Sequence, residues 1–324
     1  MHFNTPRGVV MAGGAAQLAA RPSVLHVRGL PVLGRGVWLA AQLLSDRFVL
    51  VAARLRSCLE PSARARATVV HNGIVAAPPI PMREARAGAV AWLAERGRAV
   101  DPSSRWVVSL SAPVPFKGLH HLVEAAHRLS LAGRHRITWI LAGQGHGDDY
   151  ERWLRRRASD HGLDVCFIGH VDDVHRWLSA ADAFVLASVT GETLRFDGRT
   201  VELAGEEGLP RSILESLSAG TPVIATDGGG VREQVDAGRT GLVIPPSDPA
   251  ALAAAVDEVL SDASWQARVR ELGPRVVAER FPVDSASRGL AEVLHASRPR
   301  SLLAARARNA LALTVDGLIA ARKG

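Results

Sequence analysis

Short runs of apolar and β-branched residues alternate with longer stretches of helical periodicity along most of the chain. Short apolar runs between turn residues indicate strands, whereas apolar residues recurring every three or four positions indicate helices. This alternation predicts parallel sheets with crossover helices, an α/β fold. The elements expected before residue 73 make half of a Rossmann-like domain: helix Val9–Ala20, strand Ser23–Val27, helix Val37–Leu44, strand Phe48–Ala52, helix Arg54–Leu59 and strand Thr68–His71.

A proline-rich segment, NGIVAAPPIPM at residues 72–82, interrupts this order. Pro78, Pro79 and Pro81 exclude a regular helix or strand ladder and favour a semi-rigid linker. We therefore expect a partial N-terminal domain over residues 1–76, a linker over 77–83 and a C-terminal domain over 84–296.

The alternation resumes after the linker and predicts a complete doubly wound domain. Its expected helices are Glu84–Arg96, Leu119–Leu131, Tyr150–His161, Asp173–Ala180, Pro210–Ala219, Val231–Asp236 and Pro249–Leu260, with two more over 264–296. Its expected strands are Trp106–Leu110, Ile137–Ala142, Val165–Ile168, Ala183–Ala187, Pro222–Ala225 and Gly241–Ile244.

The last segment, residues 297–324, reads as a basic amphipathic helix. Two interpretations stay open for it: an interfacial helix in peripheral contact with a membrane, or a surface helix packed on its own domain. The apolar residues at helical spacing are Leu303, Leu311, Val315 and Leu318, and basic residues surround them: Arg298, Arg300, Arg306, Arg308, Arg322 and Lys323.

The composition is that of an ordinary globular protein, with 47% hydrophobic and 22% charged residues. Cys58 and Cys166 lie in unrelated contexts, so a disulfide framework is not expected and a reducing compartment is favoured. The most apolar stretch, residues 36–53, contains Asp46 and Arg47 and does not reach the roughly 18 apolar residues that span a bilayer. We expect a cytoplasmic protein, with any membrane contact at the inner face.

The formal net charge of +7 comes almost wholly from arginine, because Lys117 and Lys323 are the only lysines among 39 basic residues. The arginines are scattered, and no helix-turn-helix, zinc-finger or aromatic-basic strand signature accompanies them. We therefore expect no nucleic-acid partner, and favour an anionic small molecule or membrane surface.

The strongest chemical signal is EEGLPRSILESLSAGTPVIATDGGGVREQV, residues 206–235. Glu207 and Glu215 are separated by seven residues around a Gly-Leu-Pro turn. Pro210 is expected at the first helical position, where its missing N–H costs nothing. A helix starting here would direct its backbone N–H groups and positive dipole end toward an anion such as phosphate.

This segment resembles the hallmark EGxPxxxLEAxAxGxPVxAT of the retaining nucleotide-sugar glycosyltransferases of family 4, also called group 1, which have the GT-B fold. The resemblance covers residues 68–295 and implies two Rossmann-like domains, the N-terminal one incomplete and on the acceptor side. Other segments that resemble the family are SAPVPFKGLHHLVEAAHRL (111–129), WILAGQG (139–145), CFIGHVDDVHRWLSAADAFVLAS (166–188) and GGGVREQVDAGRTGLVIPPSDP (228–249).

The resemblance also implies site roles. Lys117 is similar to the lysine that neutralises the donor diphosphate. Glu207 is similar to the residue that binds the transferred sugar, and Glu215 to the one that binds the ribose hydroxyls. His26 aligns with a histidine at the interdomain cleft, and a core histidine satisfied by backbone is the alternative. Lys117, Glu207 and His26 are the catalytic candidates; the other donor-binding candidates are Gly118, Gly143, Gly145, Val171, Gly208, Leu209 and Pro210.

The implied function is transfer of a sugar from a nucleotide diphosphate donor to a glycan or lipid-linked acceptor, with retention, in bacterial cell-surface polysaccharide or glycolipid synthesis. No cofactor and no protein-bound metal are expected: the histidines at positions 120, 121, 161, 170 and 175 form no ligand pattern such as HExxH. A degenerate, non-catalytic nucleotide-sugar-binding module is the alternative. An epimerase of the same fold is disfavoured by the glutamate pair.

Two departures from the family pattern stand out. Ala112 occupies the place of an arginine five residues before the lysine, which either lowers donor affinity or is compensated by another arginine. The chain also starts with a segment similar to the middle of the acceptor-binding domain, so the family's first strands and glycine-rich loop are expected to be absent. Residues 189–205 are longer and more polar than a typical connection and predict a mobile loop over the cleft.

Overall fold

The computed structural model describes residues 1–30, 33–78, 80–145 and 149–298. The chain divides into two compact units, Met1–Val70 with the residues from Arg288 onward, and His71–Ser287. Each unit is described by itself.

The division between the units differs from the one that the proline pattern predicts. It falls directly after Val70, before the expected linker, and the last described helix, α12 (Val283–Ala296), contributes to both units. Gly289 explains why the end of α12 belongs to the first unit, because a Cβ at this position would lie 3.2 Å from Val70 Cγ1. The absent side chain lets α12 approach the end of the first sheet.

The first unit contains a four-stranded parallel sheet in the consecutive order β1-β2-β3-β4. A short 3₁₀ helix (Ala53–Cys58) replaces the expected α-helix over 54–59, and the two-residue strand β1 has no counterpart among the expected elements. The strands are β1 (His2–Phe3), β2 (Val24–Val27), β3 (Arg47–Leu50) and β4 (Ala67–Val69). The helices are α1 (Pro6–Leu18), α2 (Arg35–Leu44) and α3 (Pro61–Arg64).

The second unit contains a six-stranded parallel sheet in the order β12-β11-β8-β5-β6-β7. Counted from its own first strand, this is the Rossmann order 3-2-1-4-5-6, and its direction of winding reverses between β5 and β8. The strands are β5 (Arg105–Leu110), β6 (Ile137–Ala142), β7 (Val165–Gly169), β8 (Ala183–Leu186), β11 (Val223–Thr226) and β12 (Gly241–Ile244).

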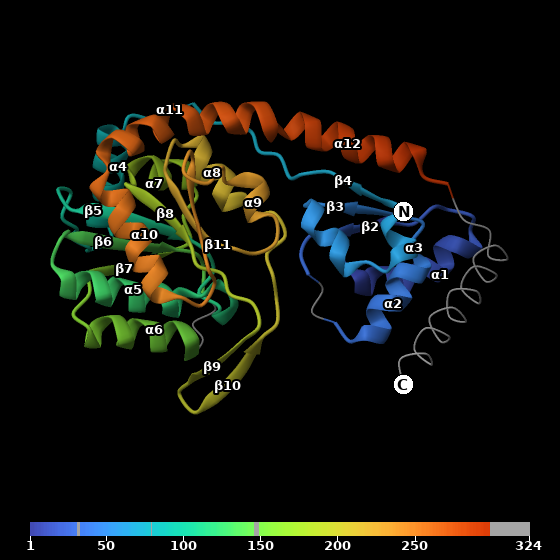
Figure 1. The fold of residues 1–324 in the computed structure, drawn as a ribbon, viewed down its shortest axis with the longest axis horizontal. Helices are drawn as coiled ribbons and strands as arrows, with labels where there is room; N and C mark the ends of the chain where they lie inside the picture. Colours follow the sequence, from blue (N-terminus) through green and yellow to red (C-terminus); the bar gives the residue numbers. More distant parts are fainter. Residues whose placement is uncertain (31–32, 79, 146–148, 299–324) are drawn as a thin grey trace. The chain divides into compact units, whose positions relative to one another are not determined.

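Helices cover both faces of this sheet (Figure 1). One face carries α5 (Leu119–Ala132), α6 (Asp149–Asp160) and α10 (Pro249–Ser261). The other carries α4 (Met82–Ala94), α7 (Val174–Ala180), α8 (Arg211–Ser218) and α11 (Ala263–Arg280), while α9 (Val231–Gln234) packs beside α8. The fold is therefore the α/β class that the alternating pattern predicts.

Residues 189–205 contain an antiparallel hairpin in place of the loop that their length and polarity predict. Strands β9 (Glu192–Phe196) and β10 (Arg199–Leu203) pair with Phe196 opposite Arg199. Asp197 and Gly198 form the connection, both with positive φ (45° and 73°), as a two-residue type I′ turn requires. Phe196 packs against the rings of Tyr150 and Trp153 on α6, which holds the hairpin to the unit.

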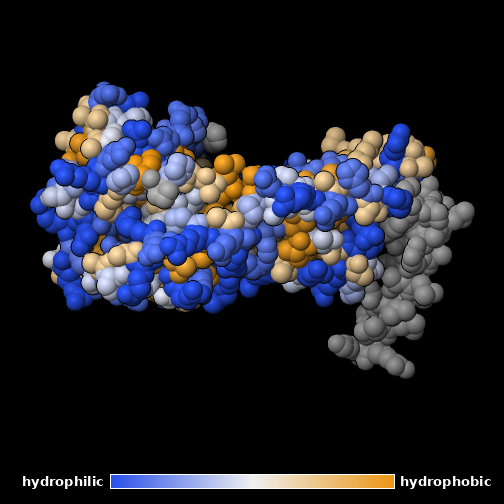
Figure 2. All heavy atoms as spheres, turned by 90° about the horizontal axis from the view of Figure 1, so that it is seen from above, coloured by the Kyte–Doolittle hydropathy of each residue, from blue (hydrophilic) through white to orange (hydrophobic). Residues whose placement is uncertain are grey.

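The exposed surface is mainly hydrophilic on the face drawn in Figure 2, where hydrophobic residues gather in small patches. Across residues 1–298, apart from the gaps already given, no helix is long and apolar enough to cross a membrane. The expected basic amphipathic helix falls almost entirely on residues 299–324 and so lies outside the described residues.

Candidate active site

The candidate site of the second unit lies at the carboxyl ends of β5 and β8, where the sheet reverses its winding. Open α/β sheets bind ligands at this point, because adjacent connections leave the sheet toward opposite faces. Lys117 ends a 3₁₀ turn after β5, and Ser188 follows β8. Gly118 brings the two connections together: it has a φ of +63°, and a Cβ here would lie only 1.9 Å from Ala187 O. This close approach requires glycine.

An ion pair forms the centre of the site. Lys117 Nζ donates to Glu207 Oε1 at 2.5 Å, and the Ser188 hydroxyl donates to the same oxygen at 2.6 Å. The Ser188 carbonyl in turn accepts from Thr226 Oγ1 at 2.5 Å. The Lys117 and Glu207 side chains are 24% and 13% exposed, so this network is fixed in position yet open to a ligand.

The Gly208–Pro210 turn is held by hydrogen bonds to its carbonyls. Gly208 O accepts from Gly230 N at 2.6 Å, Leu209 O from Asn72 Nδ2 at 2.9 Å, and Pro210 O from Gln234 Nε2 at 2.9 Å. Each bond draws in a segment distant in sequence, and together they fix the entry to α8.

Pro210 is the N-cap residue of α8, and the helix begins at Arg211 rather than at the expected first position, Pro210. The extended ψ of 121° places proline just outside the first turn. A proline side chain cannot accept a hydrogen bond, so it does not cap the backbone N–H groups of that turn. The helix N-terminus therefore keeps its capacity for an anion.

The glycine-rich loop after β11 is anchored to the residue before Glu207. Glu206 Oε1 accepts from Gly229 N at 2.6 Å. Gly229 has a φ of +51°, and a Cβ here would lie 1.9 Å from Glu207 O. The loop therefore packs directly against the backbone that carries the Glu207 side chain.

Glu215 lies on the second turn of α8 with its side chain 27% exposed. Its Oε1 accepts from the guanidinium of Arg211 at 3.1 Å, one helical turn earlier. Because Arg211 is 65% exposed, a ligand hydroxyl could replace this weak surface pair at little cost.

The other donor-binding candidates lie after β6 and β7. Gly143 approaches the connection after β5, since a Cβ would lie 2.1 Å from Ser111 O, and a Cβ on Gly145 would lie 1.9 Å from Glu151 Oε2. Val171 is buried and lines a cavity of about 200 Å³ beside Trp92 and Trp177.

His26 belongs to the first unit, on β2, so the structure groups it separately from Lys117 and Glu207. Its Nε2 is buried without a hydrogen-bond partner, which contradicts the interpretation of a core histidine fully satisfied by the backbone. Burial, with smaller contributions from His2 and Arg28, lowers the pKa of His26 to about 4. The imidazole is therefore neutral at neutral pH.

Sequence reasoning missed two residues of this site and one residue of a separate cluster. The only sequence signal for Ser188 is its place as a polar residue after a strand, and the only signal for Glu206 is its position next to Glu207. The third is Glu192, whose carboxylate meets His120 and His121 although sequence spacing shows no ligand set among the histidines.

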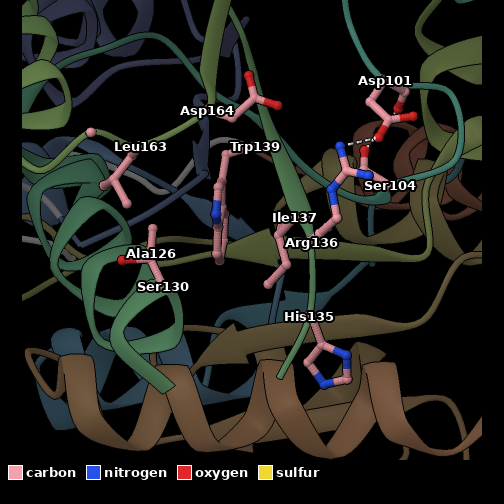
Figure 3. Close-up of a pocket in the computed structure, with 11 residues that line it drawn as sticks. Asp101, Ser104, Ala126, Ser130, His135, Arg136, Ile137, Trp139, Leu163 and Asp164 are labelled. Atoms are coloured by element: carbon pink, nitrogen blue, oxygen red, sulfur yellow. Dashed lines mark hydrogen bonds and ion pairs between the residues drawn. The ribbon is translucent and has the colours of Figure 1, made fainter. Parts of the chain in front are cut away.

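A second cavity, of about 270 Å³, opens at the opposite, amino-terminal edge of the sheet (Figure 3). Several of its polar groups already have partners: Arg136 pairs with Asp101 at 2.6 Å, and Ser104 and Asp164 each hydrogen-bond to Thr138 at 2.7 Å. Since its lining offers mainly satisfied groups and lies far along the strands from Lys117, we assign the candidate site to the carboxyl edge.

A sequence model of the family "Glycosyl transferases group 1" matches residues 95–276, which is more than half of the chain and includes the whole ion-pair network. The chain belongs to the group 1 glycosyltransferases. Its curated relatives include the lipopolysaccharide core biosynthesis glycosyltransferase LpsE of Rhizobium meliloti, 30% identical over 60% of this chain and 50% of that protein.

A second relative of this group 1 glycosyltransferase is the GDP-mannose-dependent alpha-(1-6)-phosphatidylinositol monomannoside mannosyltransferase of Mycobacterium tuberculosis. It is 33% identical over 58% of this chain and 46% of that protein. The chain thus spans about half the length of the curated relatives it matches. Among solved structures, Anabaena Alr3699/HepE in complex with UDP shares the fold with a TM-score of 0.73 at 21% identity, over 91% of this chain and 78% of that one. The fold is GT-B-like, as expected.

Proposed function

We propose that this group 1 glycosyltransferase transfers a sugar from a nucleotide diphosphate donor to a glycan or lipid-linked acceptor with retention of configuration, as a member of family 4. The observation that carries the proposal is the Lys117–Glu207 ion pair at the point where the sheet reverses, beside the uncapped N-terminus of α8. This arrangement supplies positive charge for a diphosphate and a carboxylate for sugar hydroxyls in one place.

In the proposed mechanism Lys117 and the α8 N-terminus bind the diphosphate and stabilise the negative charge that grows on it. Glu207 accepts hydrogen bonds from hydroxyls of the transferred sugar, and Glu215 from the ribose. The bond between the anomeric carbon and the phosphate oxygen breaks, and the acceptor oxygen bonds to the same face. The acceptor proton moves to the departing phosphate oxygen, so the step needs neither a cofactor nor a metal at the diphosphate.

The names of the relatives support a nucleotide-sugar donor and leave the identity of its nucleotide base open. One is named for lipopolysaccharide core synthesis and another for GDP-mannose and a phosphatidylinositol monomannoside, while the structural neighbour Alr3699/HepE is described with UDP and with UDP-glucose. We propose Gly143, Gly145 and Val171 as further contacts to the nucleotide. His26, in the first unit, stays a catalytic candidate.

The second candidate is a nucleotide-sugar-binding module without transferase activity. Ala112 favours it, because an arginine at this position would add a second cation for the diphosphate. The two candidates differ in the reaction they allow and not in the ligand they bind.

Incubation of the purified chain with radiolabelled UDP-, GDP- and ADP-sugars and with lipid-linked or lipopolysaccharide-core acceptors tests the proposal. We expect label to enter the acceptor fraction from one donor, and Glu207→Ala to reduce this transfer at least about tenfold. Glu258→Ala, an exposed glutamate on α10, is the matched control and should transfer as the wild type does. Donor binding without transfer to any acceptor would favour the binding module.

A further inference from the structure

Two histidines and a glutamate meet beside the β9–β10 hairpin. His120 Nε2 lies 3.0 Å from Glu192 Oε1, and His121 Nε2 lies 2.8 Å from Glu192 Oε2. One nitrogen or oxygen ligand atom from each of the three residues lies within 4.8 Å of the other two. His120 is 7% exposed, and the other two side chains are 16% and 18% exposed, so the cluster is shielded but reachable from solvent.

The fold brings these residues together across a long sequence separation. His120 and His121 are in the first turn of α5, and their rings lie against one another with centroids 4.1 Å apart. Neighbouring residues on a helix normally point in different directions, yet both Nε2 atoms are directed at one carboxylate. Glu192 is the first residue of β9, so its position is set by the hairpin.

The surrounding residues orient the cluster. The buried Tyr150 hydroxyl lies 2.8 Å from His120 Nδ1, the ring nitrogen that faces away from Glu192. Ser247 Oγ donates to Glu192 Oε2 at 2.5 Å. Ser247 holds a φ of +55°, an uncommon backbone conformation for serine that the structure maintains at this contact. A polar partner on the far nitrogen is typical of imidazoles that bind metal ions.

We propose that His120, His121 and Glu192 bind one divalent transition-metal ion, with Zn²⁺ as the best match, and that the ion fastens the hairpin to the N-terminus of α5. Two imidazole nitrogens and one carboxylate oxygen form a recognised zinc donor set. Ligand distances of about 2.0 to 2.2 Å in a tetrahedron separate the ligand atoms by about 3.3 Å. The three ligand atoms already lie within 4.8 Å of one another, so side-chain rotation is enough to bring them to this separation. Water completes the coordination.

The proposed ion is structural. It would join the hairpin to the turn that directly follows Lys117 and Gly118, and it takes no part in bond making or breaking. The proposal goes beyond the transferase function and does not depend on it. The competing explanation is a hydrogen-bonded cluster in which Glu192 accepts from both imidazoles and Ser247 without an ion.

Titration of the tag-free, metal-stripped chain with Co²⁺, followed by its visible absorption bands, separates the two. We expect one saturable equivalent per chain, displaced by Zn²⁺, and loss of this equivalent in both Glu192→Gln and His121→Asn. Tyr150→Phe should keep the site and weaken it about 10- to 100-fold, because only the orienting hydroxyl is removed. The matched control is His135→Asn, which removes a histidine paired with a carboxylate, Asp257, elsewhere in the unit.

Limited trypsin digestion gives a second readout for variants that fold poorly. Arg195 and Arg199 are exposed on the hairpin, and we expect Zn²⁺ to slow cleavage there in the wild type and in His135→Asn. Absence of a saturable site in the wild type, or a site unchanged by Glu192→Gln and His121→Asn, would overturn the proposal, whatever the outcome of the transferase assays.

Discussion

Replacement of Lys117 by alanine probes the ion pair at the candidate site. The wild-type ammonium makes a 2.5 Å hydrogen bond to Glu207, and both side chains are more than three-quarters buried. If Lys117 binds the donor diphosphate as proposed, removing it deletes one charge-assisted contact, which costs about 1.5 to 3 kcal/mol. We therefore expect nucleotide diphosphate affinity to fall about 10- to 150-fold.

Calorimetric titration with the free nucleotide diphosphates UDP and GDP measures this loss without any contribution from the sugar. Lys117→Arg is the matched control, because it keeps the charge and should recover part of the affinity. Glu207→Gln should leave the affinity for the free nucleotide diphosphate nearly unchanged and weaken binding of the corresponding nucleotide sugar. Equal losses in Lys117→Ala and Glu207→Gln for the free nucleotide diphosphate would refute a direct lysine–phosphate contact, and unchanged affinity in Lys117→Ala would refute the site.

Three further predictions concern the framework of the two units. Gly118→Ala should destabilise the second unit by about 2 to 5 kcal/mol in thermal unfolding, because the new methyl group would overlap Ala187 O. Gly133→Ala is the control, since it has a similar φ but open space around it, and should cost only about 1 to 2 kcal/mol. Similar losses of stability in the two variants would contradict the close approach at Gly118. Phe196→Ala should cost about 3 kcal/mol of local stability, seen as faster hydrogen exchange of the hairpin amides, and unchanged exchange would show that its packing does not hold the hairpin. The pKa of His26 is lowered from 6.5 to about 4, so the stability it contributes is present above pH 6.5 and is lost as the pH falls toward 4. Calorimetric unfolding should therefore show that His26→Gln loses less stability than the wild type over this pH range. An equal loss of stability in the two proteins would rule out His26 as its source.

The sequence predicts the second unit closely because its apolar periodicity is regular. The strand expected over Ile137–Ala142 has these bounds in the structure, and most other elements differ by one to three residues at their ends. The glutamate motif likewise pointed to Glu207 and to the turn before α8. A strand buried between two helical layers leaves a run of apolar residues that needs no tertiary information to recognise.

The hairpin and the cluster of His120, His121 and Glu192 show which features local sequence patterns do not reveal. Asp197-Gly198 is a type I′ turn signal, but the flanking strands contain charged residues at exposed positions, and these made the segment resemble a loop. Glu192 lies 72 residues from His120, so only the packing of the hairpin on α6 brings the two together. The Lys117–Glu207 pair likewise depends on strand order, which periodicity alone does not determine.

The anomeric configuration of the product tests the central claim most directly. Proton NMR of the purified chain, incubated with the accepted nucleotide sugar and acceptor, reports the configuration of the new linkage and the release of nucleotide diphosphate together. We predict that the sugar keeps the anomeric configuration it had in the donor, with one nucleotide diphosphate released per linkage, and that Glu207→Ala forms product at least about tenfold more slowly. An inverted linkage, or transfer at the wild-type rate by Glu207→Ala, would contradict the account.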